Sequence, residues 1–323
     1  MIKQPDTVQY RVAVVGGGEN CEHDVSVASA AAVVAALESF GHQAVPFTID
    51  PQGRWHAGRQ QIEFGAAVTT LRDCDVVFPV LHGPRGEDGT VAALCELVGV
   101  PYVGSGVGAG ALAMDKWATK LVAGAVGIAT APSTLLTEGT AASYDFSHPV
   151  VVKPVSAGSS FGVSLARTPV QLATALTHAF GFADRVLVED VVVGREIDVA
   201  VLGRPDGSRF VAPALEIIVE ELFGHAEKYG GAAGFRVPAD IADADHIALA
   251  DAAITMYDAL GCRGLARIDF FLTEDGPVLN EANTMPGFTE QSQAPKMFDA
   301  AGTGYQELVN MLVSDAIAGE KLR

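Results

Sequence analysis

Two segments near the C-terminus, LARIDFFL and PVLNEAN, alternate polar and apolar residues as β-strands do. Alternation places Arg267 and Asp269 on one face of the first segment, and Glu281 and Asn283 on one face of the second. The apolar neighbours are Ile268, Phe270, Phe271, Val278 and Leu279. Burying four polar groups there costs free energy unless they share a ligand, although they could also pair only with one another. Carboxylate and amide oxygens suit Mg2+ and arginine suits phosphoryl oxygens, so the pattern predicts ATP chemistry.

Composition and charge limit the partners of this chain. Its 323 residues, 49% of them hydrophobic, suffice for two or three packed units at about 100–200 residues per domain. The formal charge of −18 and a pI near 4.7 would repel nucleic acids and anionic membranes, so neither is an expected partner. The sequence lacks an apolar run of about 18 residues and an apolar N-terminal signal, which predicts a cytoplasmic protein. Four cysteines without a CxxC pair favour buried thiols in a reducing compartment.

Strand and helix signals divide the chain into three predicted units. Residues 1–115 alternate strands such as RVAVVGGG and DVVFPVLHG with helices, which predicts an α/β domain with a mostly parallel sheet that also includes PYVG. Residues 116–193 read as a helix and short strands around a glycine and serine loop, a small α+β lobe. Residues 194–323 contain the two polar-faced strands and a long helix. The loop at about residues 220–235 is rich in glycine and is the predicted lid.

Two motifs in the middle unit could contact a nucleotide. In VVVKPVSAGSSFGVS, Lys153 ends a buried strand and small residues follow, so an ammonium group and backbone N–H groups could meet phosphate oxygens. This is not a Walker motif, because the lysine precedes the glycines, and an ordinary flexible hairpin is the alternative. In VEDVVVGRE, Glu189 and Glu196 could hold the adenine amino edge and the ribose hydroxyls, or they could be solvated strand ends.

Two loops in the first unit also contain candidate site residues. LHGPRGEDG sets His82 at the carboxyl end of a strand, where open α/β sheets place ligands, although a lone histidine is usually structural. GGGENCEHDVS looks like a dinucleotide-binding turn, but it lacks G-x-G-x-x-G. Glu22, near the start of the following helix, would oppose a pyrophosphate. A nicotinamide-dependent oxidoreductase is therefore disfavoured.

Seven motifs together carry a resemblance to a known family. HGPRGEDG, AMDK, VVKP…GSSFGVS, GREIDVAVLG, EKY, ARIDFF and LNEANTMPGFT occur in the order and at the spacing of the D-alanine:D-alanine ligases of the ATP-grasp superfamily. The resemblance extends from Val12 to about Leu312. It implies an ATP-grasp fold with an N-terminal parallel α/β domain, a small central lobe and a C-terminal α+β domain. It also implies a homodimer that joins two D-alanines for peptidoglycan precursors, through an acylphosphate made from ATP.

The resemblance assigns the ATP site residue by residue. Lys116 and Lys153 would contact ATP, with Glu189 at the adenine and Glu196 at the ribose. Two Mg2+ ions, for which Mn2+ could substitute, would be held by Asp269, Glu281 and Asn283. Lys228 would reach the transferring phosphoryl group from the lid, while Arg267 and the backbone N–H of Gly287 would stabilise the oxyanion.

The resemblance likewise assigns the amino acid sites. Glu22 would pair with the ammonium group of the first D-alanine, assisted by His82 and by hydrogen bonds to Ser159 and Tyr229. Ser292 would receive the carboxylate of the second. Family members with a lysine-tyrosine pair in the lid generally form an amide rather than an ester, so Lys228-Tyr229 favours an amine as the acceptor.

The chain departs from the family pattern at several positions. Asn20 stands where serine is usual, and Gly224-His225 replaces the more usual Asp-Tyr in the lid. Polar side chains occupy positions beside the acceptor site where apolar ones are common: Glu290, Gln291 and Gln293. Two alternatives follow. One is the same chemistry with a different acceptor amino acid, as in an antibiotic-pathway or self-resistance ligase, and the other is a catalytically silent nucleotide-binding module.

Overall fold

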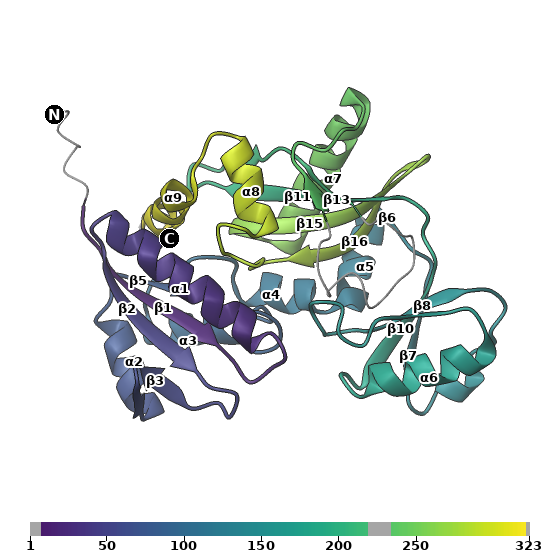
Figure 1. Ribbon diagram of the computed structural model, residues 1–323, viewed down its shortest axis with the longest axis horizontal. Helices are drawn as coiled ribbons and strands as arrows, with labels where there is room; N and C mark the ends of the chain where they lie inside the picture. Colours follow the sequence, from purple (N-terminus) through teal and green to yellow (C-terminus); the bar gives the residue numbers. More distant parts are fainter. Residues whose placement is uncertain (1–7, 219–233, 321–323) are drawn as a thin grey trace.

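In the part of the chain that the structure describes, three sheets hold the strands, and helices pack around each of them (Figure 1). In this computed structural model, the residues that the structure describes are 8–218 and 234–320. The predicted mixture of α/β and α+β parts is confirmed. The three sheets follow one another along the chain, apart from the short strand β6 (Ala129–Thr130), which joins the third sheet. The domain boundaries at residues 115/116 and 193/194 stay a prediction.

The first sheet, in the order β4-β3-β2-β1-β5, lies in the N-terminal part of the chain. Its strands are β1 (Arg11–Gly17), β2 (Gln43–Ile49), β3 (Trp55–Ala57), β4 (Gln60–Ile62) and β5 (Val76–Pro79). The helices of this part are α1 (His23–Ser39), α2 (Phe64–Arg72), α3 (Thr90–Val98) and α4 (Val107–Met114). The strand β1 pairs in parallel with β2 and β5, as predicted. The strand expected at PYVG is reduced to one bridge between Val77 and Tyr102, since Pro101 has no N–H to extend a ladder.

The second sheet, in the order β7-β10-β8-β9, is antiparallel throughout. Its strands are β7 (Ser133–Thr137), β8 (Val150–Pro154), β9 (Ser164–Ala166) and β10 (Arg185–Asp190). A short 3-10 turn, η1 (Ala141–Ser143), follows β7. The helix α6 (Pro169–Phe180) packs on this sheet and starts where Thr168 accepts a hydrogen bond from the N–H of Gln171, with proline in the first turn.

The third sheet carries the two polar-faced segments at its centre, in the order β14-β13-β11-β15-β16-β6, with β12 paired to β11. Its further strands are β11 (Arg195–Gly203), β12 (Arg209–Val211), β13 (Leu215–Ile218), β14 (Gly234–Arg236), β15 (Gly264–Thr273) and β16 (Gly276–Asn283). Its helices are α5 (Lys116–Ala125), α7 (Asp243–Leu260), α8 (Gln293–Ala300) and α9 (Tyr305–Glu320). The sequence did not predict α8, because four polar residues precede its apolar turn.

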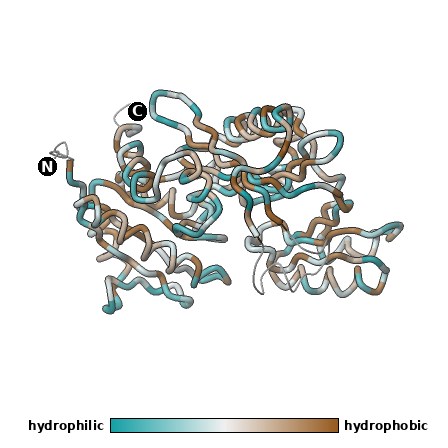
Figure 2. The backbone as a smooth tube through the Cα atoms, turned by 45° about the horizontal axis from the view of Figure 1, so that its top comes forward, coloured by the Kyte–Doolittle hydropathy of each residue, from teal (hydrophilic) through white to brown (hydrophobic). Residues whose placement is uncertain are grey.

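Alternate residues of β11 enter two different cores. Val199 and Val201 pack with the apolar side of α7, whereas Ala200 and Leu202 pack with Phe298 of α8. This second core also includes apolar residues of α1, α9 and the first sheet, so the N-terminal and C-terminal parts share one interior. Figure 2 shows apolar stretches along the inner strands and polar ones at many of the outer loops. Within residues 8–218 and 234–320, no helix combines the length and apolar character needed to cross a membrane.

Candidate active site

The adjacent strands β15 and β16 bring the four polar groups together as predicted. In this antiparallel pair Asp269 lies directly opposite Glu281, and Arg267 lies directly opposite Asn283. A β-bulge after Asp269 shifts the register, so the apolar remainder of the two strands still pairs in the core. The four side chains therefore lie on one patch of one sheet, formed by two strands that the chain connects through a tight turn.

Arg267 is held on several sides by oxygen acceptors. Its Nε and Nη2 donate to the two carboxylate oxygens of Asp269 over 2.7 Å each, a bidentate pair. Nη1 donates to Oε1 of Gln293, the first residue of α8. Burial alone would lower the pKa of Arg267. The negative charges of Asp269 and Asp198 outweigh burial and raise this pKa above its ordinary value. The guanidinium is therefore a fixed cation on this face of the sheet.

Asp198 belongs to this cluster, although the sequence analysis did not single it out. It lies on β11 directly opposite Asp269, is fully buried, and has an oxygen 3.6 Å from Nε of Arg267. Burial and the nearby Asp269 raise its pKa well above the ordinary value. A signal was available in REIDVAVLG, because Asp198 follows Glu196 at the spacing that puts both on one strand face. Glu196 itself is half-buried on β11.

The predicted metal ligands have the right chemistry for Mg2+. Asp269, Glu281 and Asn283 offer two carboxylates and an amide from neighbouring strands, the hard oxygen donors that Mg2+ prefers. Within the described part of the chain, three or more His, Cys, Asp or Glu side chains do not converge on one point, and the predicted set contains only two acids. Asn283 donates to Asp269 over 2.9 Å. The set fits the ion by its donors, and Mg2+ stays a proposal.

Glu281 faces the predicted nucleotide site through Lys116. Its Oε2 lies 3.2 Å from Nζ of Lys116, which also donates to the carbonyl oxygen of Ala157 over 2.7 Å. Burial works against ionisation, but Lys116, Arg267 and Lys153 together lower the pKa of Glu281. Glu281 is thus an ionised carboxylate at neutral pH. Lys116 opens α5, where Asp115 caps the helix.

Two lysines surround Glu189. Lys153 and Lys120 place Nζ 2.6 Å and 2.8 Å from its two carboxylate oxygens, and the side chain is only 6% exposed. Burial would raise the pKa of Glu189, but the two ammonium groups outweigh it and lower the pKa. Lys120 was missed by the sequence analysis. Its signal was a spacing of four residues from Lys116, which places both lysines on one side of α5.

The structure also brings Glu22 and Ser159 together. Ser159 Oγ donates to Oε1 of Glu22, which is 6% exposed. Oε2 of Glu22 lies against two glycines, since an added Cβ at Gly83 or at Gly158 would come within 2.5 Å of it. Burial raises the pKa of Glu22, with a further contribution from Glu281. An anion enclosed by glycine in this way suits a small cationic group.

Asn20, one of the departures from the family pattern, organises the loop beside Glu22. Its Nδ2 donates to the carbonyl oxygens of His82 and Pro84 over 2.8 and 3.0 Å. Its Oδ1 accepts from the backbone N–H of Glu22 over 2.9 Å. The asparagine therefore replaces the usual serine with a side chain that bonds both loops of the site at once.

His82 is engaged by the protein on both ring nitrogens. Nδ1 donates to the carbonyl oxygen of Met285 over 3.0 Å, and Nε2 accepts from Ser29 Oγ over 3.3 Å. The ring is 3% exposed, and burial lowers the pKa of His82 to about 4. A neutral imidazole with both nitrogens paired joins the N-terminal part to the C-terminal part. This arrangement suits indirect assistance at the substrate site better than direct contact.

The turn that contains Gly287 is fixed on both sides. The N–H of Phe288 donates to Ser29 Oγ over 3.2 Å, and the N–H of Thr289 donates to Ser292 Oγ over 3.0 Å. Pro286 has no N–H. Within the described residues no acceptor pairs with the N–H of Gly287, which leaves this donor for a ligand. Ser292 occupies the N-cap position of α8.

The remaining predicted residues have mixed outcomes. Lys228 and Tyr229, with Gly224 and His225, lie outside the described residues. Glu290 accepts a hydrogen bond from Gln306 over 3.0 Å. Gln291 is exposed. Gln293 faces Arg267, so one of the three polar departures belongs to the site.

Comparison with known proteins identifies the family. The family described as D-ala D-ala ligase N-terminus matches residues 11–70 and 59–105, and D-ala D-ala ligase C-terminus matches residues 125–314. The D-alanine–D-alanine ligase of Nocardia farcinica is 38% identical, over 97% of this chain and 98% of that protein. D-alanine–D-alanine ligase A of Mesorhizobium japonicum is 39% identical, over 97% of this chain and 99% of that protein.

Solved structures agree with these relatives. The VanG D-Ala:D-Ser ligase from Enterococcus faecalis superimposes with a TM-score of 0.82 at 30% identity, covering 96% of this chain and all of that chain. The Bacillus anthracis D-alanine–D-alanine ligase complexed with ATP has a TM-score of 0.80 at 26% identity, covering 97% of this chain and 99% of that chain. The chain therefore belongs to the D-alanine–D-alanine ligase family of ATP-dependent ligases, with the ATP-grasp fold.

Proposed function

We propose that this ligase joins two D-alanines to D-alanyl-D-alanine for peptidoglycan precursors, in the cytoplasm and as a homodimer. The observation that carries the proposal is the proximity of the two halves of the site. Lys116, on the nucleotide side, donates to the carbonyl oxygen of Ala157 over 2.7 Å, and the next two residues, Gly158 and Ser159, lie against the carboxylate of Glu22 on the amino acid side. An ammonium group at Glu22 would therefore lie within reach of a phosphate at Lys116.

The first proposed step is phosphoryl transfer. A carboxylate oxygen of the first D-alanine bonds to the γ-phosphorus of ATP as the bond to the β-phosphate oxygen breaks, which gives an acylphosphate and ADP. Lys116 and Lys153 hold the nucleotide, with Glu189 and Glu196 at its adenine and ribose ends, and Lys228 would reach the transferring phosphoryl group from the lid. Two Mg2+ ions held by Asp269, Glu281 and Asn283 would neutralise phosphate charge.

The second proposed step forms the peptide bond. The amine of the second D-alanine, whose carboxylate is received by Ser292, attacks the acyl carbon, and the carbonyl oxygen becomes an anion. Arg267 and the N–H of Gly287, which pairs with no acceptor in the described part of the chain, stabilise that anion by fixed positive charge and a fixed donor. The intermediate collapses as the bond to phosphate breaks, and the amine proton leaves to solvent. Glu22, which accepts from Ser159 and which Tyr229 would also support, keeps the first D-alanine oriented, and His82 assists indirectly.

Phosphate release with D-alanine tests this proposal directly. Purified protein with ATP and Mg2+ should release phosphate and form dipeptide in equal amounts only when D-alanine is present. Phosphate release that is indifferent to D-alanine would reject the substrate and leave the fold untouched. Light scattering on the purified enzyme tests the dimer separately.

A second candidate differs only in the acceptor amino acid. Gln293 brings a polar side chain beside Arg267, where apolar residues are common in the family. The structurally similar VanG protein is named as a D-Ala:D-Ser ligase. If a polar acceptor is preferred, D-alanine with D-serine should give a mixed dipeptide faster than D-alanine alone. Equal or slower turnover with D-serine supports the first candidate.

A further inference from the structure

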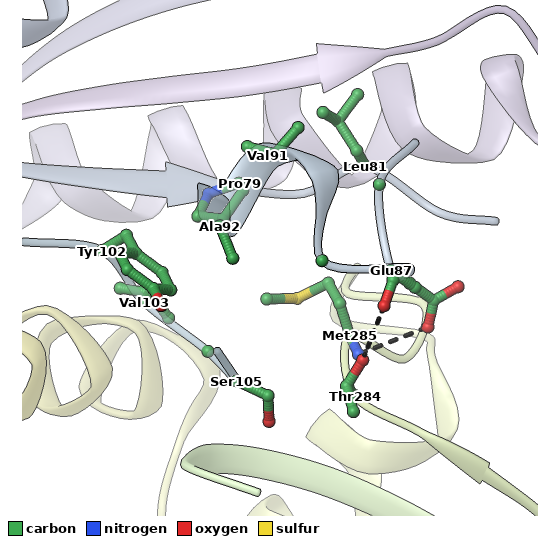
Figure 3. A pocket seen from close by; sticks show the side chains of 13 residues that line it. Pro79, Leu81, Glu87, Val91, Ala92, Tyr102, Val103, Ser105, Thr284 and Met285 are labelled. Carbon is green, nitrogen blue, oxygen red and sulfur yellow. Dashed lines mark hydrogen bonds between the residues drawn. The ribbon is translucent and has the colours of Figure 1, made fainter. Parts of the chain in front are cut away.

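Two loops from opposite ends of the chain are joined beside the site. One contains His82, Gly83 and Glu87, and the other is the turn from Thr284 to Phe288. The hydroxyl of Thr284 donates to the carbonyl oxygen of Glu87 over 3.4 Å, one of two hydrogen bonds drawn in Figure 3. His82 adds its own bond to this turn, as described above. The relative position of the two loops therefore depends on a small set of hydrogen bonds.

The carboxylate of Glu87 bonds both loops at once. Oε2 accepts from the N–H of Gly83 over 2.8 Å, and Oε1 accepts from the N–H of Met285 over 3.3 Å, the second bond drawn in Figure 3. Gly83 is one of the two glycines against Glu22. Met285 lies two residues before Gly287. One side chain thus connects the backbone at the donor site with the backbone of the predicted oxyanion site.

Packing leaves a small gap at this junction. A cavity of about 30 Å3 lies beside Glu87 and is lined by Leu81, Tyr102, Thr284 and Met285, among others (Figure 3). That volume is enough for a water molecule. Since this cavity borders Thr284 and Met285, that part of the turn has room to move if its hydrogen bonds are lost. A displacement of about 1 Å can reduce the rate by about 100-fold when it misplaces a donor aimed at a reacting atom.

We propose that Glu87 is a positioning residue, which holds the N–H of Gly287 at a fixed place relative to Glu22. The inference rests on the proposed ligase function, in which these two groups act on one amino acid substrate. Glu87 does not touch the substrate. It acts through the backbone of Gly83 on one side and of Met285 on the other. Loss of its second acceptor oxygen should therefore impair turnover more than nucleotide binding.

Glu87→Gln is the informative substitution. Glutamine keeps the size of the side chain but has one acceptor oxygen and an NH2 group, so it can accept from only one of the two N–H groups. The matched control is Glu96→Gln. Glu96 lies on α3 and accepts from the hydroxyl of Tyr102, so its amide form retains an acceptor and leaves both loops alone. Assays belong at about pH 8.5, because burial and the charge of Glu22 raise the pKa of Glu87 to about 8.

The expected result is a loss of kcat by roughly 10- to 100-fold in Glu87→Gln, because misplacing a catalytic donor by about 1 Å can cost about 100-fold. The KM for ATP and the melting temperature should stay close to those of the wild type and of Glu96→Gln. Turnover within twofold of wild type would overturn the inference, as would a loss shared equally by the control. Failure of the wild-type enzyme to make dipeptide is a different outcome, and it rejects the proposed function instead.

Hydrogen exchange gives a second readout that does not depend on activity. In Glu87→Gln, the amides of residues 284–288 should exchange faster than in the wild type, while those of α7 should not change. If Glu87→Gln does not fold, Glu87→Asp serves in its place, because its shorter side chain reaches only one of the two N–H groups. Unchanged exchange at residues 284–288 in a folded variant would refute the role.

Discussion

The buried histidine at the junction makes stability depend on pH in a way that can be calculated. His82 is almost fully buried and neutral, with its ring between the Met285 carbonyl oxygen and the Ser29 hydroxyl. Protonation would give both nitrogens a hydrogen, so Nε2 would point a donor at a hydroxyl that already accepts from Phe288. Burial and this geometry both favour the neutral ring. The unfolded chain has no such preference and binds a proton at an ordinary pKa.

The direction and size of this change in stability follow from the pKa of His82 in the folded and in the unfolded chain. The pKa of His82 is about 4 in the folded protein, against about 6.5 in an unfolded chain. Between these values the unfolded state binds more protons, so stability rises with pH and is lost as pH falls from about 6.5 to about 4. The full effect is about 3.4 kcal/mol, and the part between about pH 7.5 and pH 5.5 is about 1.3 kcal/mol.

Urea unfolding at these two pH values tests the calculation. The lower value stays above the sequence pI of about 4.7, where the protein would be least soluble. His82→Gln can still donate to Met285 and accept from Ser29, but it cannot titrate. Its stability should therefore fall by about 1.3 kcal/mol less than that of the wild type across the interval. His178→Gln, at an exposed position on α6, is the control and should behave as the wild type. Equal slopes in wild type and His82→Gln would refute the reasoning.

Three further substitutions test separate parts of the site. Glu281→Gln should lower kcat by at least about 100-fold, because a metal ligand contributes several kcal/mol to charge stabilisation. Steady-state phosphate release measures kcat, and turnover near that of the wild type would contradict a role of Glu281 as a metal ligand. Gly158→Ala places a Cβ about 2.5 Å from the Glu22 carboxylate and should raise the KM for the first D-alanine roughly tenfold. Gly124→Ala is the control, because an added Cβ there meets nothing within 4 Å, and it should leave this KM unchanged. Gln293→Leu should lower the ratio of D-serine to D-alanine used as acceptor, measured by product chromatography, and an unchanged ratio would exclude this side chain from acceptor choice.

Local patterns in the sequence predicted the faces of the two central strands but not their register. Alternation placed Asp269 on one face of its strand and Glu281 on one face of the next. It could not decide that these residues lie opposite each other, because a bulge after Asp269 shifts the pairing by one residue. Two missed residues, Asp198 and Lys120, stand two and four positions from predicted ones, so strand and helix periodicity could have found them.

Strand and helix periodicity could not have identified Glu87. It lies inside HGPRGEDG, a motif in which the sequence indicated only His82 as a candidate site residue. Its partner Met285 is 198 residues away, and the bond joins a side chain to a backbone N–H, which every residue except proline possesses. Almost any residue at position 285 could therefore make this contact, and the side chain of Met285 gives no sign of it. Contacts of this kind become visible only when the fold places the two loops side by side.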